Sequence, residues 1–283
     1  MRFSGSLSAF RRSLRRAFRE DDVTDAAAAV TYYAFLSIPS LLLVAVGFFG
    51  LFAGPGTVGS LVRRLSDVVP AEVTTLLEAS LTRVTENRGG GAVMVAVGFA
   101  VAAWTTSGAM GAVMRALNRI YGRREARGFV EQRATGIAMA GLAVVAFALV
   151  FGLLVLGPHL SRWVGEALGL EKVVGWVWWL GQWPILLGGL LLAFAGIYWL
   201  GPSLERRRFR WWTPGALLAV ALWLAASAAF AVYVSMFGSY NKAWGSLTAV
   251  IVMLTWIWLS SLAFLLGAEL NAELEGKREH PIE

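Results

Sequence analysis

Acid–base or metal chemistry in this chain would have to come from two histidines and 18 carboxylates. A nuclease needs carboxylates grouped around metal ions, or a paired acid and base. His159 and His280 lie far apart in the sequence, and the carboxylates occur in short polar segments and at the ends of apolar runs, without an HxH or DxD arrangement. There is no cysteine, so thiolate chemistry and disulfides are excluded. We therefore predict no catalytic residue, no metal site and no cofactor, and hence no enzyme.

A carboxylate beside the last apolar run is the first candidate for another kind of chemistry. Glu269 and Asn271 follow that run directly and are expected where its helix meets water. A partly buried carboxyl group at this position could act as a gate or as a proton-coupling group. The alternative is an ordinary polar helix end, and the position outside the apolar run favours it.

A basic segment supplies the second candidate. Asn118 and Tyr121 precede Arg123, Arg124 and Arg127, whose guanidinium groups could cradle a lipid phosphate. The alternative interpretation is a topology signal, and it is the stronger one.

Aromatic and basic residues elsewhere complete a candidate substrate path or gate. The group around Tyr240 and Trp244 is interpreted as an interface belt, with a substrate wall as the alternative. Arg207 and Arg208 could attract an anionic headgroup opposite Glu269. The full set is Tyr33, Ser37, Pro39, Asn118, Tyr121, Arg207, Arg208, Tyr233, Tyr240, Trp244, Glu269 and Asn271.

The elements that must position these residues are membrane helices. The chain is 57% hydrophobic and 15% charged, whereas soluble proteins carry about 25% charged residues. Its charges gather between long apolar runs, each long enough to cross a hydrocarbon core of about 30 Å. We predict an all-α polytopic membrane protein whose single helical domain covers 1–275, with a flexible tail at 276–283. The predicted spans are about 26–53, 92–114, 134–156, 173–200, 214–237 and 245–268.

The connections between spans carry further expectations. Residues 1–19 predict an amphipathic helix in the headgroup region, with a disordered basic segment as the alternative. Residues 54–91 contain two amphipathic stripes, predicted to be helices that lie on the membrane surface or cap the bundle, the second ended by the glycines at 89–91. Residues 158–172 are expected to be a short connection. Pro39 predicts a kink or tilt in the first span. Pro214-Gly215 predicts that the fifth span starts here and that its helix packs closely against a neighbour.

The distribution of positive charge predicts the orientation. Of 25 Lys and Arg residues, 18 fall in the N-terminal segment, the 115–133 and 201–213 loops and the tail, and seven fall on the opposite side. By the positive-inside rule both termini are cytoplasmic. The expected partners are membrane lipids, with anionic headgroups at the cytoplasmic face, and no nucleic acid, although the net charge is +7.

Several stretches resemble the YihY/BrkB family of bacterial inner-membrane proteins, once labelled ribonuclease BN. They are AAAVTYYAFLSIP (27–39), LNRIYG (117–122), WWTPGA (211–216), FGSYNKAWGSL (237–247) and GAELNA (267–272). The resemblance covers essentially the whole chain in the family's order. One departure is Trp244, where a tyrosine is expected before the glycine, and aromatic character is kept.

The resemblance implies a multi-pass protein of the bacterial inner membrane. It implies that the nuclease label is a misassignment and that members are candidate transporters or envelope-integrity proteins. With uncharged span interiors and no nucleotide-binding loop, we expect a translocation path for a lipid or other amphipathic envelope molecule. A scaffold that moves nothing is the alternative, a ribonuclease is the least favoured function, and a homo-oligomer or an envelope protein is the further partner considered.

Overall fold

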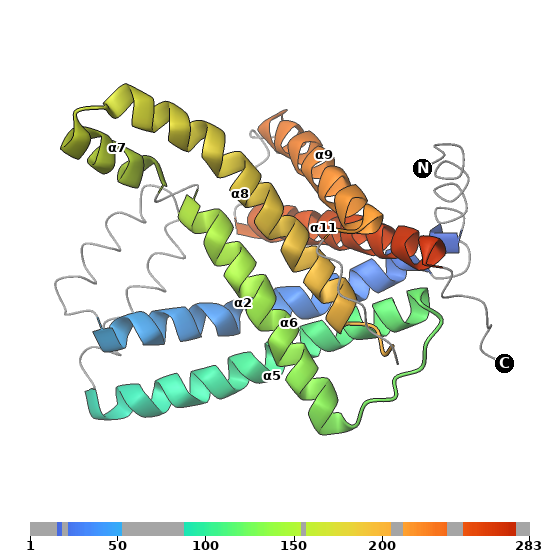
Figure 1. Ribbon diagram of the computed structural model, residues 1–283. Helices are drawn as coiled ribbons and strands as arrows, with labels where there is room; N and C mark the ends of the chain where they lie inside the picture. The colour runs from blue at the N-terminus through green and yellow to red at the C-terminus, as the bar shows by residue number, and fades with distance from the viewer. Residues whose placement is uncertain are drawn as a thin grey trace, which may run out of the picture. The chain divides into compact units, whose positions relative to one another are not determined.

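The computed structural model describes residues 16–18, 22–52, 88–153, 157–204, 212–236 and 246–275 (Figure 1). Within these ranges the chain is helical, without a strand. The helices are α2 (Val23–Phe52), α5 (Arg88–Ile120), α6 (Phe129–Phe151), α7 (Gly157–Leu168), α8 (Glu171–Leu200), α9 (Pro214–Met236) and α11 (Ser246–Leu274). The predicted all-α class is confirmed.

Four of these helices are long and apolar enough to cross a membrane. They cover Phe129–Val150, Glu171–Leu200, Pro214–Ser235 and Thr248–Leu274, close to the last four predicted spans. The helices α2 and α5, of 30 and 33 residues, occupy the places of the first two. The count of six spans remains a prediction, as do the kink at Pro39 and the single domain. Most of the N-terminal segment, the stripes within 54–87 and the tail lie outside the described residues.

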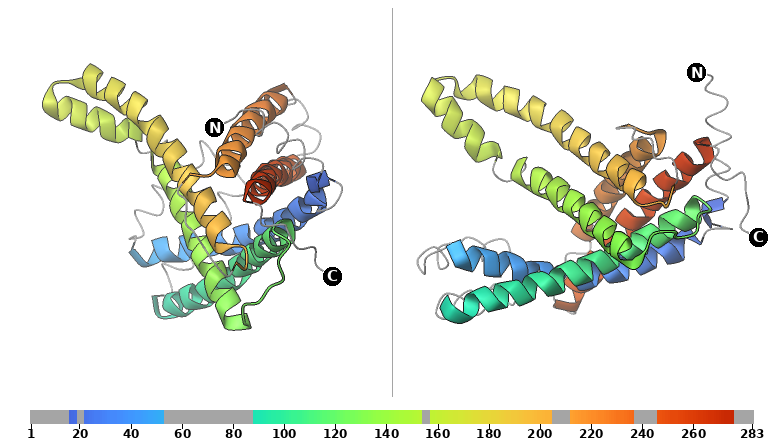
Figure 2. Two further views of the ribbon diagram at one scale, coloured as in Figure 1. Left: turned by 45° about the vertical axis from the view of Figure 1, so that its right-hand side comes forward. Right: turned by 60° about the horizontal axis from the view of Figure 1, so that its bottom comes forward.

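Two boundaries differ from the predictions. The glycines at 89–91 do not precede a span, because they lie in the first turns of α5. Residues 158–172 are not a simple connection, because most of them form α7. That helix ends at Gly169, whose φ of +65° is a backbone conformation glycine adopts without strain. The chain then turns at once into α8, so α7 packs against the first half of α8 (Figure 2).

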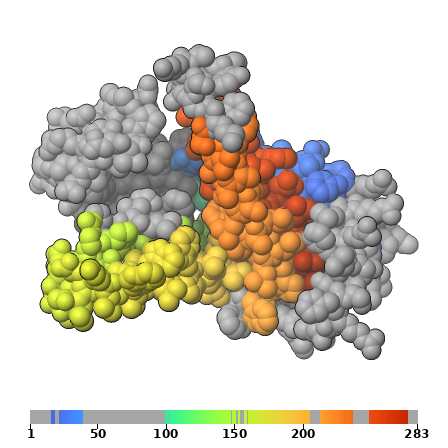
Figure 3. Space-filling model, turned by 90° about the horizontal axis from the view of Figure 1, so that it is seen from above, coloured from blue at the N-terminus to red at the C-terminus, as the bar shows by residue number. Residues whose placement is uncertain are grey.

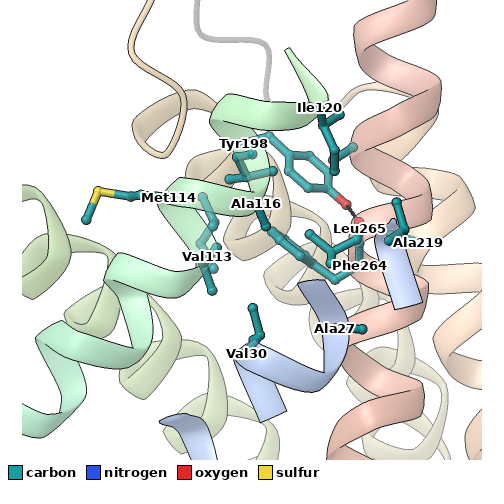
Figure 4. Packing of buried hydrophobic residues seen from close by; sticks show 14 of the residues in the cluster. Ala27, Val30, Val113, Met114, Ala116, Ile120, Tyr198, Ala219, Phe264 and Leu265 are labelled. Carbon is teal, nitrogen blue, oxygen red and sulfur yellow. Dashed lines mark hydrogen bonds between the residues drawn. The ribbon is translucent and has the colours of Figure 1, made fainter. Parts of the chain in front are cut away.

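The described residues group into two compact units. Unit 1 takes in Met1–Tyr32 and Met110–Glu283, and unit 2 takes in Tyr33–Ala109. The apolar core of unit 1 joins the start of α2, the last turns of α5, the end of α8, and the facing parts of α9 and α11 (Figure 4). Its fully buried members include Val23, Leu117 and Leu265.

Helix α9 packs along α11, which is its main partner, and also contacts α8. Figure 3 shows α9 at the surface, with α8 to one side. Near its start α9 is buried at Ala216, Ala219 and Val220, whereas much of its second half is exposed. Such a large exposed apolar surface is unfavourable in water and is consistent with a helix surrounded by membrane lipid.

Candidate functional site

Two glycines, Gly215 and Gly267, bring the backbones of α9 and α11 into direct contact, and we call this contact the crossing. A Cβ on Gly215 would strike the carbonyl oxygen of Gly267 and the side chain of Asn271. A Cβ on Gly267 would strike the carbonyl oxygen of Gly215 and would meet Ala219 Cβ and the Tyr198 hydroxyl at 2.7 Å. Small residues allow membrane helices to pack backbone against backbone. The start at Pro214 and the close packing at Gly215 are therefore confirmed.

A side chain from α11 completes the N-terminal cap of α9. The hydroxyl oxygen of Thr213 accepts the backbone N–H of Ala216 at 3.1 Å. The Oδ1 of Asn271 accepts the N–H of Gly215 at 2.8 Å, and its amide donates to the Thr213 hydroxyl at 2.9 Å. Pro214 has no N–H to satisfy. The N–H groups of Gly215 and Ala216 thus receive one side-chain partner each, Asn271 and Thr213, and Asn271 also bonds the Thr213 hydroxyl.

Glu269 lies on α11 two residues from both Gly267 and Asn271, and therefore on the opposite face of the helix. It is 1% exposed, and Ala268 next to it is 0% exposed. The expectation that Glu269 and Asn271 meet water at the end of the span is wrong, because α11 continues to Leu274 and both side chains are buried. A carboxylate buried inside a helix of membrane-spanning length is costly, and such residues usually serve a function.

Tyr198 of α8 ties a third helix to this crossing. Its hydroxyl donates to the carbonyl oxygen of Phe264 at 2.6 Å, and its ring stacks on the Phe264 ring with centroids 4.7 Å apart (Figure 4). Because the same hydroxyl lies beside Gly267, it holds α8 against the crossing of α9 and α11.

Asn118 holds a second polar cluster, where α5 ends. The N–H of Arg123 bonds the Asn118 carbonyl at 2.7 Å, and Gly122, with φ +59°, donates to the Arg119 carbonyl. These two bonds form a Schellman C-cap. The side chain of Asn118 faces away from the cap, accepting the N–H of Ser203 at 2.7 Å and donating to Glu125 at 2.9 Å.

The side chain of Arg127 belongs to the same polar cluster. Its guanidinium donates to both oxygens of Glu125, at 2.6 and 2.8 Å, and to the carbonyls of Leu200 and Gly201 at the end of α8. A cation at this position also complements the helix dipole. With its side chain 4% exposed, Arg127 holds protein groups rather than the lipid phosphate for which it was considered.

The electrostatics of Glu125 follow from these partners. Burial would raise the pKa of its carboxyl group. The hydrogen bonds and charge of Arg127, with the bond from Asn118, outweigh burial and hold the pKa of Glu125 below its ordinary value of 4.5.

The other predicted site residues are distributed as follows. Tyr121 is buried at 2% exposure, whereas Tyr33 and Tyr233 are exposed, the latter stacked on Phe230. The hydroxyl of Ser37 donates to the Ala34 carbonyl of its own helix, and α2 continues through Pro39. Arg207, Arg208, Tyr240 and Trp244 lie outside the described residues. The structure thus places Asn118 and Tyr121 at the end of α5 and Asn271 at the crossing. Glu269 is buried on the opposite face of α11.

Several structural residues of both clusters were not predicted. Thr213 carries a local signal, because a threonine before a proline is typical of a helix start. Tyr198 and Ser203 carry none that distinguishes them, since their partners lie 66 and 85 residues away in the chain. Glu125 lies only two residues from Arg127, but a nearby acid and base are common in a loop of this kind. Among the described residues, no three histidine, cysteine, aspartate or glutamate side chains form a group that could hold a metal ion.

Comparison with known families shows to which family the chain belongs. The model of the virulence factor BrkB family matches residues 14–283. The chain belongs to the BrkB family. This match contains both clusters, and the stretches that suggested the resemblance include Asn118, Thr213, Gly215, Gly267 and Asn271.

Relatives cover most of the BrkB-family chain. A ribonuclease-like protein, YfkH, of Bacillus subtilis is 30% identical over 219 residues, 77% of this chain and 78% of its own. A UPF0761 membrane protein of Photobacterium profundum is 27% identical over 94% of this chain and 81% of its own. A UPF0761 membrane protein of Aliivibrio salmonicida is 30% identical over 92% of this chain and 81% of its own. No solved structure matches. The chain is a membrane protein of this family, which is not a known enzyme family.

Proposed function

We propose that this BrkB-family protein provides a path along the α9–α11 hairpin for a lipid or other amphipathic molecule of the bacterial inner membrane. The observation that carries the proposal is Glu269, a carboxylate that is 1% exposed within a helix of membrane-spanning length. An ionisable group buried within such a helix is a candidate for a gate or a coupling site.

The two ends of the hairpin suit this function differently. One end is closed by Gly215, Gly267 and the Asn271 cap. The other half of each helix has many exposed residues, including Tyr233 and Trp256. An amphipathic molecule would enter along the exposed half and would meet the barrier at the crossing, in the turn of α11 that carries Glu269 on its other face.

Translocation of a fluorescent phospholipid in proteoliposomes tests the proposal. Wild type should accelerate translocation over protein-free vesicles, and Glu269→Gln should lower the rate several-fold because it removes the charge but keeps the shape. Glu275→Gln is the matched control, because this exposed carboxylate lies on the same end of the chain outside the crossing. Equal rates for wild-type and protein-free vesicles, with anionic and zwitterionic lipids alike, would refute the proposal.

The close packing at Gly215 and Gly267 favours a second candidate, a scaffold that organises other envelope proteins and moves nothing. A scaffold needs a rigid bundle and no path. It predicts no translocation by wild type and partners that remain bound to Glu269→Gln, which a pull-down from membranes would detect. The ribonuclease-like name belongs to one relative and is not carried over.

A further inference from the structure

Helix α7 has three different faces, and the first is closed by α8. Gly157, Ser161 and Gly165 are buried and four residues apart, so they form one stripe. The indole of Trp178 lies directly against Gly157, and the Glu171 backbone lies against Gly165. Side chains larger than these would hold the two helices apart.

The other two faces are exposed and differ in chemistry. Leu160, Trp163 and Ala167 follow one another at three and four residues, and the first two are 55% and 69% exposed. Arg162 and Glu166 are four residues apart and are exposed on another side. Because the helix has 3.6 residues per turn, the apolar and the charged faces are separate stripes on either side of the α8 contact.

The helix that follows α7 is of membrane-spanning length and also exposes apolar residues. In the first half of α8, Trp176, Val177 and Leu180 are 71%, 67% and 66% exposed. This helix has 30 residues, about 45 Å of length, whereas the hydrocarbon core is about 30 Å thick. One end of α8 therefore reaches the headgroup layer, and tryptophan is enriched there.

We propose that α7 lies in the membrane–water interface, with Leu160 and Trp163 against lipid and with Arg162 and Glu166 in water. The occupant of the exposed apolar face is the bilayer surface itself. The charged stripe, the exposed aromatic side chain and the direct connection to α8 together match the pattern of an interfacial amphipathic helix. This inference goes beyond the proposed function and does not depend on it.

The absence of native cysteine makes a direct test possible. Single cysteines are introduced as Leu160→Cys and Trp163→Cys on the apolar face, and as Arg162→Cys and Glu166→Cys on the charged face. Each variant is labelled with an environment-sensitive fluorophore and reconstituted into phospholipid vesicles. Quenching is measured with iodide in the water and with lipids that carry a nitroxide near the headgroup.

Labels at 160 and 163 should emit at shorter wavelength, be quenched strongly by the nitroxide lipids and be several-fold less sensitive to iodide than labels at 162 and 166. Equal iodide quenching at all four positions would refute the proposal, because α7 would then lie in water. Labels at 160 and 163 that are protected from both quenchers would also refute it, because a protein would then cover that face. Labelled variants are compared only where they elute from size exclusion like wild type.

Discussion

At the scale of single residues, Gly215 and Gly267 leave no space for a side chain. Either glycine changed to alanine would force the α9 and α11 backbones apart, since the added carbon meets backbone atoms that have no freedom to rotate away. Overpacking of this kind costs about 1–3 kcal/mol. We expect Gly215→Ala and Gly267→Ala to lower the free energy of unfolding by this amount in a denaturant titration in micelles.

Gly141→Ala in α6 is the matched control for these glycines. A Cβ at that position meets no atom within 4 Å. Alanine also favours a helix interior over glycine, by up to about 1 kcal/mol. A loss of stability in Gly141→Ala as large as that in Gly215→Ala would contradict the packing argument.

The shared cap of α9 leads to a second prediction. Asn271→Ala and Thr213→Ala each remove part of it, and each should cost about 1 kcal/mol of stability. Because the two side chains also bond each other, the double variant should cost less than the sum of the singles. A double-mutant cycle in unfolding free energy measures this coupling, and strict additivity would contradict it.

Glu125 predicts a dependence of stability on pH. Its pKa is lower in the folded protein than its ordinary value of 4.5, so its stabilising contribution is fully present above pH 4.5 and is lost as pH falls through the folded pKa. The stability difference between wild type and Glu125→Gln should therefore shrink below pH 4.5. In an Arg127→Gln background this dependence should be much weaker. A difference that grows on acidification would contradict the assignment.

Sequence reasoning found important positions in both clusters but did not establish their roles. Asn118 and Asn271 were considered as parts of a substrate path, and the structure shows each of them bonding a backbone amide of another segment. Such roles depend on partners that are 85 and 56 residues away in the chain, and local spacing carries no information about them.

At the scale of elements, α9 and α11 are joined by two indole–hydroxyl bonds. Trp223 donates to Ser260 at 3.0 Å, and Trp256 donates to Ser227 at 3.4 Å. Interhelical hydrogen bonds in membranes average about 0.6 kcal/mol. We expect a cycle of Trp223→Phe and Ser260→Ala to show a coupling of this size in unfolding free energy, and a smaller one for Trp256 and Ser227. Coupling near zero for the shorter bond would contradict this prediction.

Helix bounds were predictable where composition changes abruptly. The start of α9 at Pro214 and the end of α8 at Leu200 match the predicted limits. Helix α7 was missed because glycine and proline suggest a loop, whereas here the glycines make the contact with α8. The length of α11 was underestimated because a charged residue, Glu269, was expected to lie where the helix meets water, whereas it is buried.

At the scale of the whole molecule, the predicted orientation places the 121–128 loop in the cytoplasm and α7 at the periplasmic side. We expect Glu166→Cys to react with a membrane-impermeant thiol reagent in intact spheroplasts, and Arg124→Cys to react only after the membrane is opened. Both positions are exposed. Reaction of the two cysteines from the same side would contradict the orientation, and the reverse pattern would invert it.

The cap of α9 also has a consequence for the order of synthesis. The ribosome makes α9 before α11, and Asn271 follows Gly215 by 56 residues. The Gly215 amide therefore lacks its final partner until the last helix has emerged. The ion pair between Arg16 and Glu273, which are 257 residues apart, likewise forms only after the end of the chain has been made. Nascent chains that stop before Asn271 should thus carry an unfinished helix end and be degraded faster than full-length chains.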